Sequence, residues 1–133
     1  MKKTDIGRCI FGLLALFFMG TGLMLMFSPA NMLNHMFIEP IESAGGLSSI
    51  RAIWGGTTIA VWASVLLGAI RSNVDYICVG FIALLMVFVG RLVGYFADGS
   101  FPQLVVSVIP TTIAMILMLI AYKLMVSTTD KTA

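Results

Sequence analysis

Charged side chains are scarce in this sequence: Asp, Glu, Lys and Arg make up 11% of its 133 residues, whereas a soluble domain has about 25%. Histidine and cysteine are scarcer still, with one and two residues, which excludes a disulfide-stapled module and a Cys/His zinc site. The net charge of +2 is too small to indicate nucleic acid or another polyanion as a partner. Apolar residues make up 59% of the chain, and this composition predicts an integral membrane protein.

Four apolar segments are long enough to cross a membrane as helices, because a bilayer core of about 30 Å needs about 20 helical residues. They comprise residues 9–27, 50–70, 76–97 and 104–125. The first is longer than the apolar region of a signal peptide, about 7–15 residues, so we expect an uncleaved helix. The fold class predicted is all-α, a polytopic membrane protein in which residues 1–133 form a single four-transmembrane-helix bundle.

The connection between the first two spans, residues 28–49, is long. Ser28 and Pro29 are favoured N-cap and first-turn residues, so they predict that a helix starts there. The apolar residues that follow share one helical face: Met32, Leu33, Met36 and Phe37. This pattern is typical of a short interfacial helix, which we place in the first outer loop.

The rest of this connection contains turn-forming residues. Glu39-Pro40 and Gly45-Gly46 predict turns, and Ser48 or Ser49 then predicts the N-cap of the second span. Arg51 would therefore lie in the first turn of that helix. Because the helix dipole disfavours a cation there, we expect Arg51 to bind a carboxylate.

The orientation follows from the basic residues near the span ends, which favour the cytoplasmic side. An even number of spans puts both termini on one side, and six basic residues lie there: Lys2, Lys3, Arg8, Arg71, Lys123 and Lys131. The opposite side has only Arg51 and Arg91. We therefore expect both termini in the cytoplasm.

Small residues at helical spacing indicate where helices pack closely, because packing drives helix association in lipid. The second span has one at every fourth position: Gly56, Ala60, Ser64 and Gly68. The third span has the GxxxG pair Gly90 and Gly94. We assign four glycines to helix packing, either within one bundle or alternatively in a dimer: Gly55, Gly56, Gly90 and Gly94. We expect the closest helix contacts at Gly56 and Gly90.

Charged and polar residues gather at the end of the bundle opposite the termini, and we call six of them the polar cluster: Arg51, Arg91, Asp98, Glu42, Glu39 and Tyr95. Arg91 lies inside a span, where an unpaired charge is costly, and Asp98 lies two turns later on the same face. Two interpretations remain open. The cluster is a salt-bridged structural contact between helices, or it binds an anionic ligand or lipid headgroup.

Two short blocks in these spans resemble a known family. Residues 51–56, R-x-x-x-G-G, and residues 90–99, G-R-x-x-G-x-x-x-D-G, are similar to signatures of the bacterial membrane family called domain of unknown function 4345. The layout also resembles small four-helix DoxX-like membrane proteins. The resemblance implies a compact bundle in the bacterial cytoplasmic (inner) membrane, with Arg51, Arg91 and Asp98 as family-type polar positions. It implies no reaction.

The sequence has no nucleophile triad and no carboxylate inside a span. We therefore expect a non-enzymatic accessory protein or a bundle that binds lipid or a small molecule, without cofactor or metal. The partners we consider are bilayer lipid, a small anionic amphiphile, another membrane protein and a second copy, but no nucleic acid. The alternative is an enzyme or transporter that acts on an anionic amphiphile at the outer face through Arg51 and Arg91.

Overall fold

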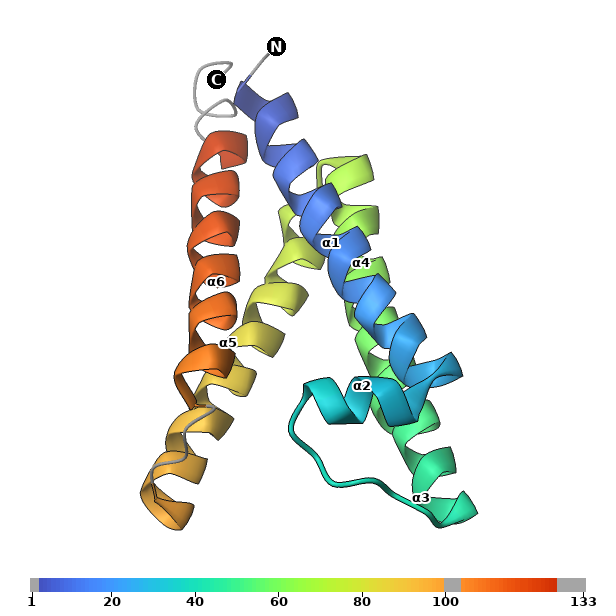
Figure 1. Ribbon diagram of the computed structural model, residues 1–133. Coiled ribbons are helices and arrows are strands. Elements are labelled where there is room, and N and C mark those ends of the chain that lie inside the picture. Colours follow the sequence, from blue (N-terminus) through green and yellow to red (C-terminus); the bar gives the residue numbers. More distant parts are fainter. Residues whose placement is uncertain (1–2, 100–103, 127–133) are drawn as a thin grey trace.

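The computed structural model describes residues 3–99 and 104–126, which are almost entirely helical (Figure 1). The helices are α1 (Lys3–Phe27), α2 (Pro29–His35), α3 (Ala44–Ser49), the π-helix η1 (Ile50–Gly56), α4 (Thr57–Arg71), α5 (Val74–Asp98) and α6 (Leu104–Val126). Because α3, η1 and α4 follow one another without a break, four helical segments are long and apolar enough to cross a membrane, as predicted. No strand occurs in the described ranges, which confirms the all-α class.

The second span starts earlier than predicted. The hydroxyl of Ser43 accepts a hydrogen bond from Gly46 N at 3.1 Å, and this N-cap starts α3 at Ala44. The predicted turn at Gly45-Gly46 and the predicted cap at Ser48 or Ser49 are therefore wrong, because Ser43 already caps the first turn of α3 through the N–H group of Gly46. Arg51 lies two turns inside this continuous helix, so its predicted position in the first turn is wrong as well.

The helix changes its geometry where the R-x-x-x-G-G block lies. Residues Ile50–Gly56 form the π-helix η1, and α-helical geometry resumes at Thr57. A π-helix is rare, and it occurs mostly as one wide turn within an α-helix, frequently at a functional site. The wide turn shifts the register of the helix, so it decides which residues of this span face α1.

The main hydrophobic core lies in the half of the bundle where α1 begins, α6 ends and α4 turns into α5, which we call the terminal half (Figure 1). Its buried residues come from all four spans: Phe11, Ala15, Trp62, Val65, Ala69, Ile77, Leu84, Ala114, Met118, Ala121 and Met125. The ring of Phe18 stacks on Trp62 with centroids 4.2 Å apart. The terminal half is therefore a four-helix bundle.

A smaller core lies at the opposite end, and its described residues come from α1, α2, η1 and the connection after α2. They are Leu25, Leu33 and Ile50, with Met32, Met36, Ile38 and Ile41 packed around them. The apolar face of α2 therefore packs on α1 and η1. Phe37 lies beyond the end of α2 with a positive φ of 61°, and its side chain is 56% exposed. Among the described residues, neither α5 nor α6 contributes to this core, and both helices diverge from α1 and η1 toward this end (Figure 1).

Two glycines allow the backbones of α1 and η1 to touch. A Cβ atom on Gly55 would lie 3.1 Å from Met26 N and 3.2 Å from Gly22 O, so Gly55 occupies a helix-packing position as predicted. The same prediction is wrong for Gly56 and Gly90, since a Cβ atom on either would meet nothing within 4 Å. Gly55 faces α1 where Gly56 does not, and the space around Gly90 is open.

Candidate functional site

Arg91 lies on the face of α5 that is buried in the first half of the helix. That face consists there of Ile77, Gly80 and Leu84. Helical spacing continues it through Phe88 to Arg91 and Gly94, which are the partly buried residues between positions 85 and 97. The guanidinium group therefore belongs to the inward face of the helix and not to its lipid-facing side.

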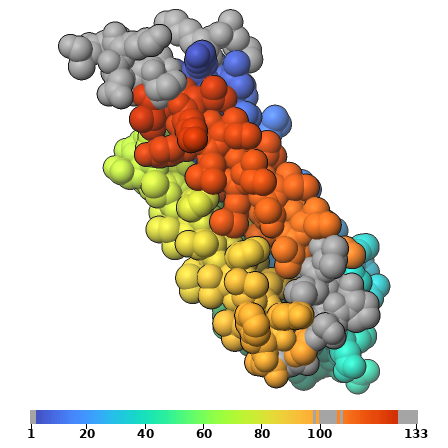
Figure 2. Space-filling model, turned by 90° about the vertical axis from the view of Figure 1, so that its left-hand side faces the viewer, coloured from blue at the N-terminus to red at the C-terminus, as the bar shows by residue number. Residues whose placement is uncertain are grey.

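The second half of α5 is less buried than the first half. No residue from Leu85 to Ala97 is buried, and large apolar side chains are exposed there, among them Met86 at 61% and Phe96 at 80%. Figure 2 shows this half of the helix, yellow to orange, at the molecular surface. A helix in a closed bundle buries one face along its whole length. The bundle is therefore open along α5 at the end opposite the termini.

The structure does not bring Arg51 or Arg91 together with Glu39 or Glu42. Arg51 on η1 is exposed, as are Glu39 and Glu42 on the connection between α2 and α3. Among the side chains that the structure describes, no hydrogen bond or ion pair joins Arg51 or Arg91 to a carboxylate. The second half of α5 and η1 lie apart at this end (Figure 1), so the predicted salt-bridged contact between the two spans is absent from the described residues.

The other two members of the polar cluster lie near the end of α5. Tyr95 is 41% exposed, and its ring makes an edge contact with Phe96 at a centroid distance of 5.4 Å. Asp98 is the last residue of α5, but its side chain lies outside the described residues. Its pairing with Arg91 therefore stays a prediction.

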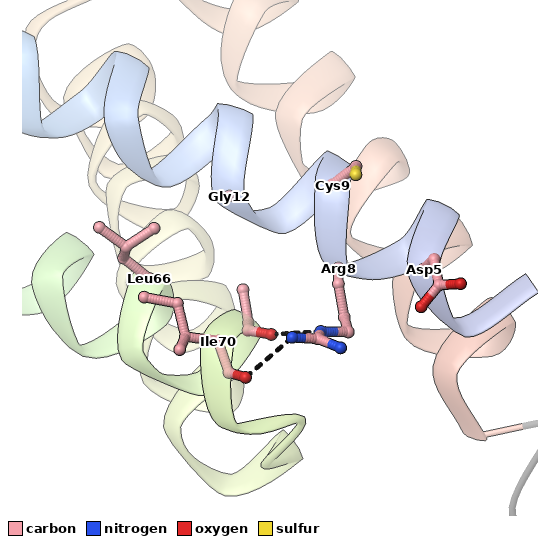
Figure 3. A pocket seen from close by; sticks show the side chains of 7 residues that line it. Asp5, Arg8, Cys9, Gly12, Leu66 and Ile70 are labelled. Atoms are coloured by element: carbon pink, nitrogen blue, oxygen red, sulfur yellow. Dashed lines mark hydrogen bonds between the residues drawn. The ribbon is translucent and has the colours of Figure 1, made fainter. Parts of the chain in front are cut away.

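A pocket that the sequence did not indicate lies between α1 and α4 in the terminal half, and we call it the α1–α4 pocket (Figure 3). It has a volume of about 290 Å³ and is lined by Asp5, Arg8, Cys9, Gly12, Leu66, Ala69 and Ile70. Side chains of both charges and an apolar wall therefore meet in one place.

Arg8 joins α1 to the end of α4. Its Nε donates to Ala69 O at 2.8 Å, and one terminal nitrogen donates to Ile70 O at 2.9 Å (Figure 3). The last four carbonyl groups of a helix have no partner within the helix, and the helix dipole favours a cation beside them. Arg8 therefore caps α4 and holds its guanidinium group at a fixed place in the α1–α4 pocket.

Sequence reasoning counted Arg8 only as a positive charge near the first span. Which helix end it would cap depends on how the spans pair, and the sequence does not state this. One signal was present: Asp5, Arg8 and Gly12 follow each other at helical spacing and so share a face of α1. Among the described residues, no three His, Cys, Asp or Glu side chains lie together in a way that could hold a metal ion.

Comparison with known proteins gives one finding. No curated protein and no solved structure shows a significant match to this chain. The profile of the family described as Domain of unknown function (DUF4345) matches residues 6–125, which include both glycine- and arginine-containing blocks. The chain therefore belongs to the DUF4345 family.

Proposed function

We propose that this protein is a non-enzymatic membrane protein that binds a small anionic amphiphile between its diverging helices, with Arg91 receiving the anionic group. One observation carries the proposal. Arg91 lies on the inward face of α5, partly buried, in a segment without a buried residue and without a carboxylate partner among the described side chains. A cation in this position needs an anion, and the described residues offer none.

The depth of Arg91 fits a ligand with a polar head and an apolar tail. The helix continues for seven residues beyond it, which is about 10 Å, so the guanidinium group can extend toward the headgroup region. An unpaired arginine at the centre of a membrane helix costs about 2.5–3.5 kcal/mol on insertion scales. An amphiphile would satisfy the charge with its head and cover the exposed apolar side chains of α5 with its tail.

Arg51 supports the same function from the other side of the diverging helices. It is exposed on η1, a π-helix, and π-helices are frequent at functional sites. The described side chains give it no carboxylate partner either. We propose that Arg51 strengthens the attraction of an anionic ligand to this end of the bundle, while Arg91 forms the direct hydrogen bonds.

The test is the binding of oleate to the purified protein in detergent. The wild type should bind oleate, and Arg91→Ala should weaken binding at least about tenfold, the loss expected for a charge-assisted hydrogen bond. Arg91→Lys should restore part of the affinity, because lysine keeps the charge and loses the planar fork of donors. Arg71→Ala, which removes an exposed arginine at the other end, is the matched control and should bind as the wild type does.

The thermal stability of the Arg91→Ala variant distinguishes this binding function from a structural role of Arg91. Since Arg91 has no described ion pair, Arg91→Ala should melt within a few degrees of the wild type. A wild type that binds no oleate, or an Arg91→Ala variant that binds it equally well, contradicts the proposal. An Arg91→Ala variant that unfolds readily but keeps its affinity would assign Arg91 to the fold instead.

We further propose that residues 1–133 form one domain in the bacterial inner membrane, with α2 in the outer interface and both termini in the cytoplasm. The described basic residues support this orientation, since Lys3, Arg8, Arg71 and Lys123 lie at the end where α1 starts and α6 stops (Figure 1). Alkaline phosphatase fused after Ala133 should therefore be inactive, and a fluorescent protein fused there should be bright. High phosphatase activity would reverse the orientation.

A further inference from the structure

We propose that Phe37 anchors the connection after α2 in the lipid interface, with its ring between the headgroups and the acyl chains of the surrounding leaflet. Three observations carry this proposal: a backbone conformation that disfavours phenylalanine, the exposure of the ring, and the packing of the apolar face of α2 within the protein. It rests on the proposed placement of α2 in the outer interface, but it does not depend on the ligand proposed for Arg91.

The turn that ends α2 requires a left-handed residue at position 37. Ile38 N donates to Leu33 O at 3.0 Å, and Phe37 N donates to Asn34 O at 3.1 Å. These two hydrogen bonds form the Schellman motif, in which one residue after the helix is left-handed, and Phe37 has this conformation with a φ of 61°. Leu33 and Ile38 both belong to the smaller core, which supplies the apolar contact that accompanies the motif. The hydrogen bonds and this contact therefore fix the backbone of Phe37 without its side chain.

Phenylalanine is an unfavourable residue for this position. Glycine, or sometimes asparagine, usually occupies it, because a Cβ atom crowds the following carbonyl oxygen in the left-handed conformation. A bulky residue with a positive φ is a genuine outlier. The fold returns little for the ring, since Phe37 is 56% exposed. Such strained residues gather where the side chain has a functional role, so we infer that the ring of Phe37 has a partner outside the chain.

The apolar face of α2 is not available to lipid. The sequence spacing puts Met32, Leu33, Met36 and Phe37 on one helical face, but the first three belong to the smaller core, and the helix ends before Phe37. From Ser28 to Ala52, a stretch that the structure describes completely, Phe37 is the one large apolar side chain that is exposed. It is therefore the side chain through which this connection can contact lipid.

The position of α2 along the bundle favours lipid over water as the surroundings of the ring. The span α1 ends at Phe27, and α2 begins at Pro29. Since a span ends where the apolar core of the bilayer gives way to headgroups, the segment that follows lies near this level. Asn34 and His35 are exposed polar neighbours of Phe37 and suit the headgroup side. Amphipathic segments at this boundary place phenylalanine rings toward the acyl chains, where the apolar surface is buried.

The depth of position 37 is measured with nitroxide spin labels in proteoliposomes of phosphatidylethanolamine and phosphatidylglycerol. The label is attached to Phe37→Cys or to Asn34→Cys, after the two exposed native cysteines, Cys9 and Cys78, are replaced with serine. Oxygen concentrates in lipid, and a nickel chelate stays in water. We expect the label at 37 to collide more often with oxygen and the label at 34 more often with the chelate. A label at 37 that favours the chelate, or one that a protein partner shields from both reagents, would overturn the proposal.

Variants of Phe37 test whether the ring holds the connection in place. Phe37→Asn keeps the left-handed turn and removes the ring, so it should shift the label at 34 further toward the chelate. Phe37→Trp should not, because indole also partitions into the interface. Ser72→Asn is the matched control, since Ser72 is the other non-glycine residue with a positive φ in the described chain.

An unchanged label at 34 in Phe37→Asn, or an equal shift in Ser72→Asn, would contradict the anchoring role. All of these variants retain Arg91, and the oleate affinity of the wild type is measured separately. A failure of the anchor is therefore distinguished from a failure of the proposed ligand binding.

Discussion

Replacing Gly55 with leucine should destabilise the protein by roughly 1–3 kcal/mol, whereas the same replacement at Gly56 should change its stability by less than about 0.5 kcal/mol. The first new Cβ atom would lie 3.1 Å from Met26 N and 3.3 Å from Met26 Cα. These are backbone atoms of α1 and cannot move aside as the end of a flexible side chain can. The two helices would have to separate and lose contact.

Adjacent glycines in the same helix provide the control for this result. Gly55 and Gly56 share helix propensity and sequence context, so the difference between their leucine variants reports the α1–η1 contact alone. Thermal unfolding in a mild detergent, followed by circular dichroism, measures it. Equal melting temperatures for the two variants would show that the helices do not cross at Gly55.

Replacing Gly80 with leucine should likewise cost roughly 1–3 kcal/mol, whereas leucine at Gly90 should leave the stability within about 0.5 kcal/mol of the wild type. Both glycines lie on α5. A Cβ atom on Gly80 would overlap Val65 Cγ2 and approach Met118 Cε at 3.4 Å, inside the main core. Around Gly90 there is open space, because the second half of α5 is less buried than the first half.

This pair tests whether the bundle is open at one end only. Urea or heat denaturation of both variants in the same detergent gives the comparison, and Gly80→Ala provides a smaller step at the buried position. If leucine at Gly90 destabilised the protein as much as leucine at Gly80, α5 would be packed along its whole length. The conclusion that α5 diverges from α1 and η1 at this end of the bundle would then be wrong.

Composition and periodicity were sufficient to predict the four apolar spans and the helix α2. Runs of apolar residues reach membrane length whatever their neighbours are, and Ser28-Pro29 starts a helix by local backbone chemistry. The start of α3 shows the limit of such rules. Gly45-Gly46 has the composition of a turn, but the hydroxyl of Ser43 satisfies the N–H of Gly46, and the residues after it become helical.

The packing glycines could not be chosen from spacing alone. A four-residue repeat selects Gly56, but the π-helix changes the register of that span, and the contact forms between Gly55 and Gly22. A π turn depends on which hydrogen bonds the tertiary structure favours, so its position cannot be predicted from residue types. Gly22 was missed because a contact needs the register of both helices.

The residues of the candidate site could be predicted from the sequence, but their contacts could not. Sequence reasoning found Arg51 and Arg91 because a charge inside an apolar span is conspicuous. It expected carboxylates beside them because the helix dipole disfavours a cation in a first turn and because an unpaired charge inside a span is costly. The divergence of α5 and α6 follows from how side chains of four helices fill the space between them, and the capping of α4 by Arg8 follows from the same pairing.

A crystal structure grown from a lipidic mesophase that contains oleate tests the central claim most directly. We expect a carboxylate head within about 2.7–2.9 Å of the Arg91 guanidinium nitrogens, the usual length of such a charge-assisted bond, and a tail along the second half of α5. A closed bundle, with α5 packed on η1 and Arg91 bound to a carboxylate of the protein itself, would contradict the account.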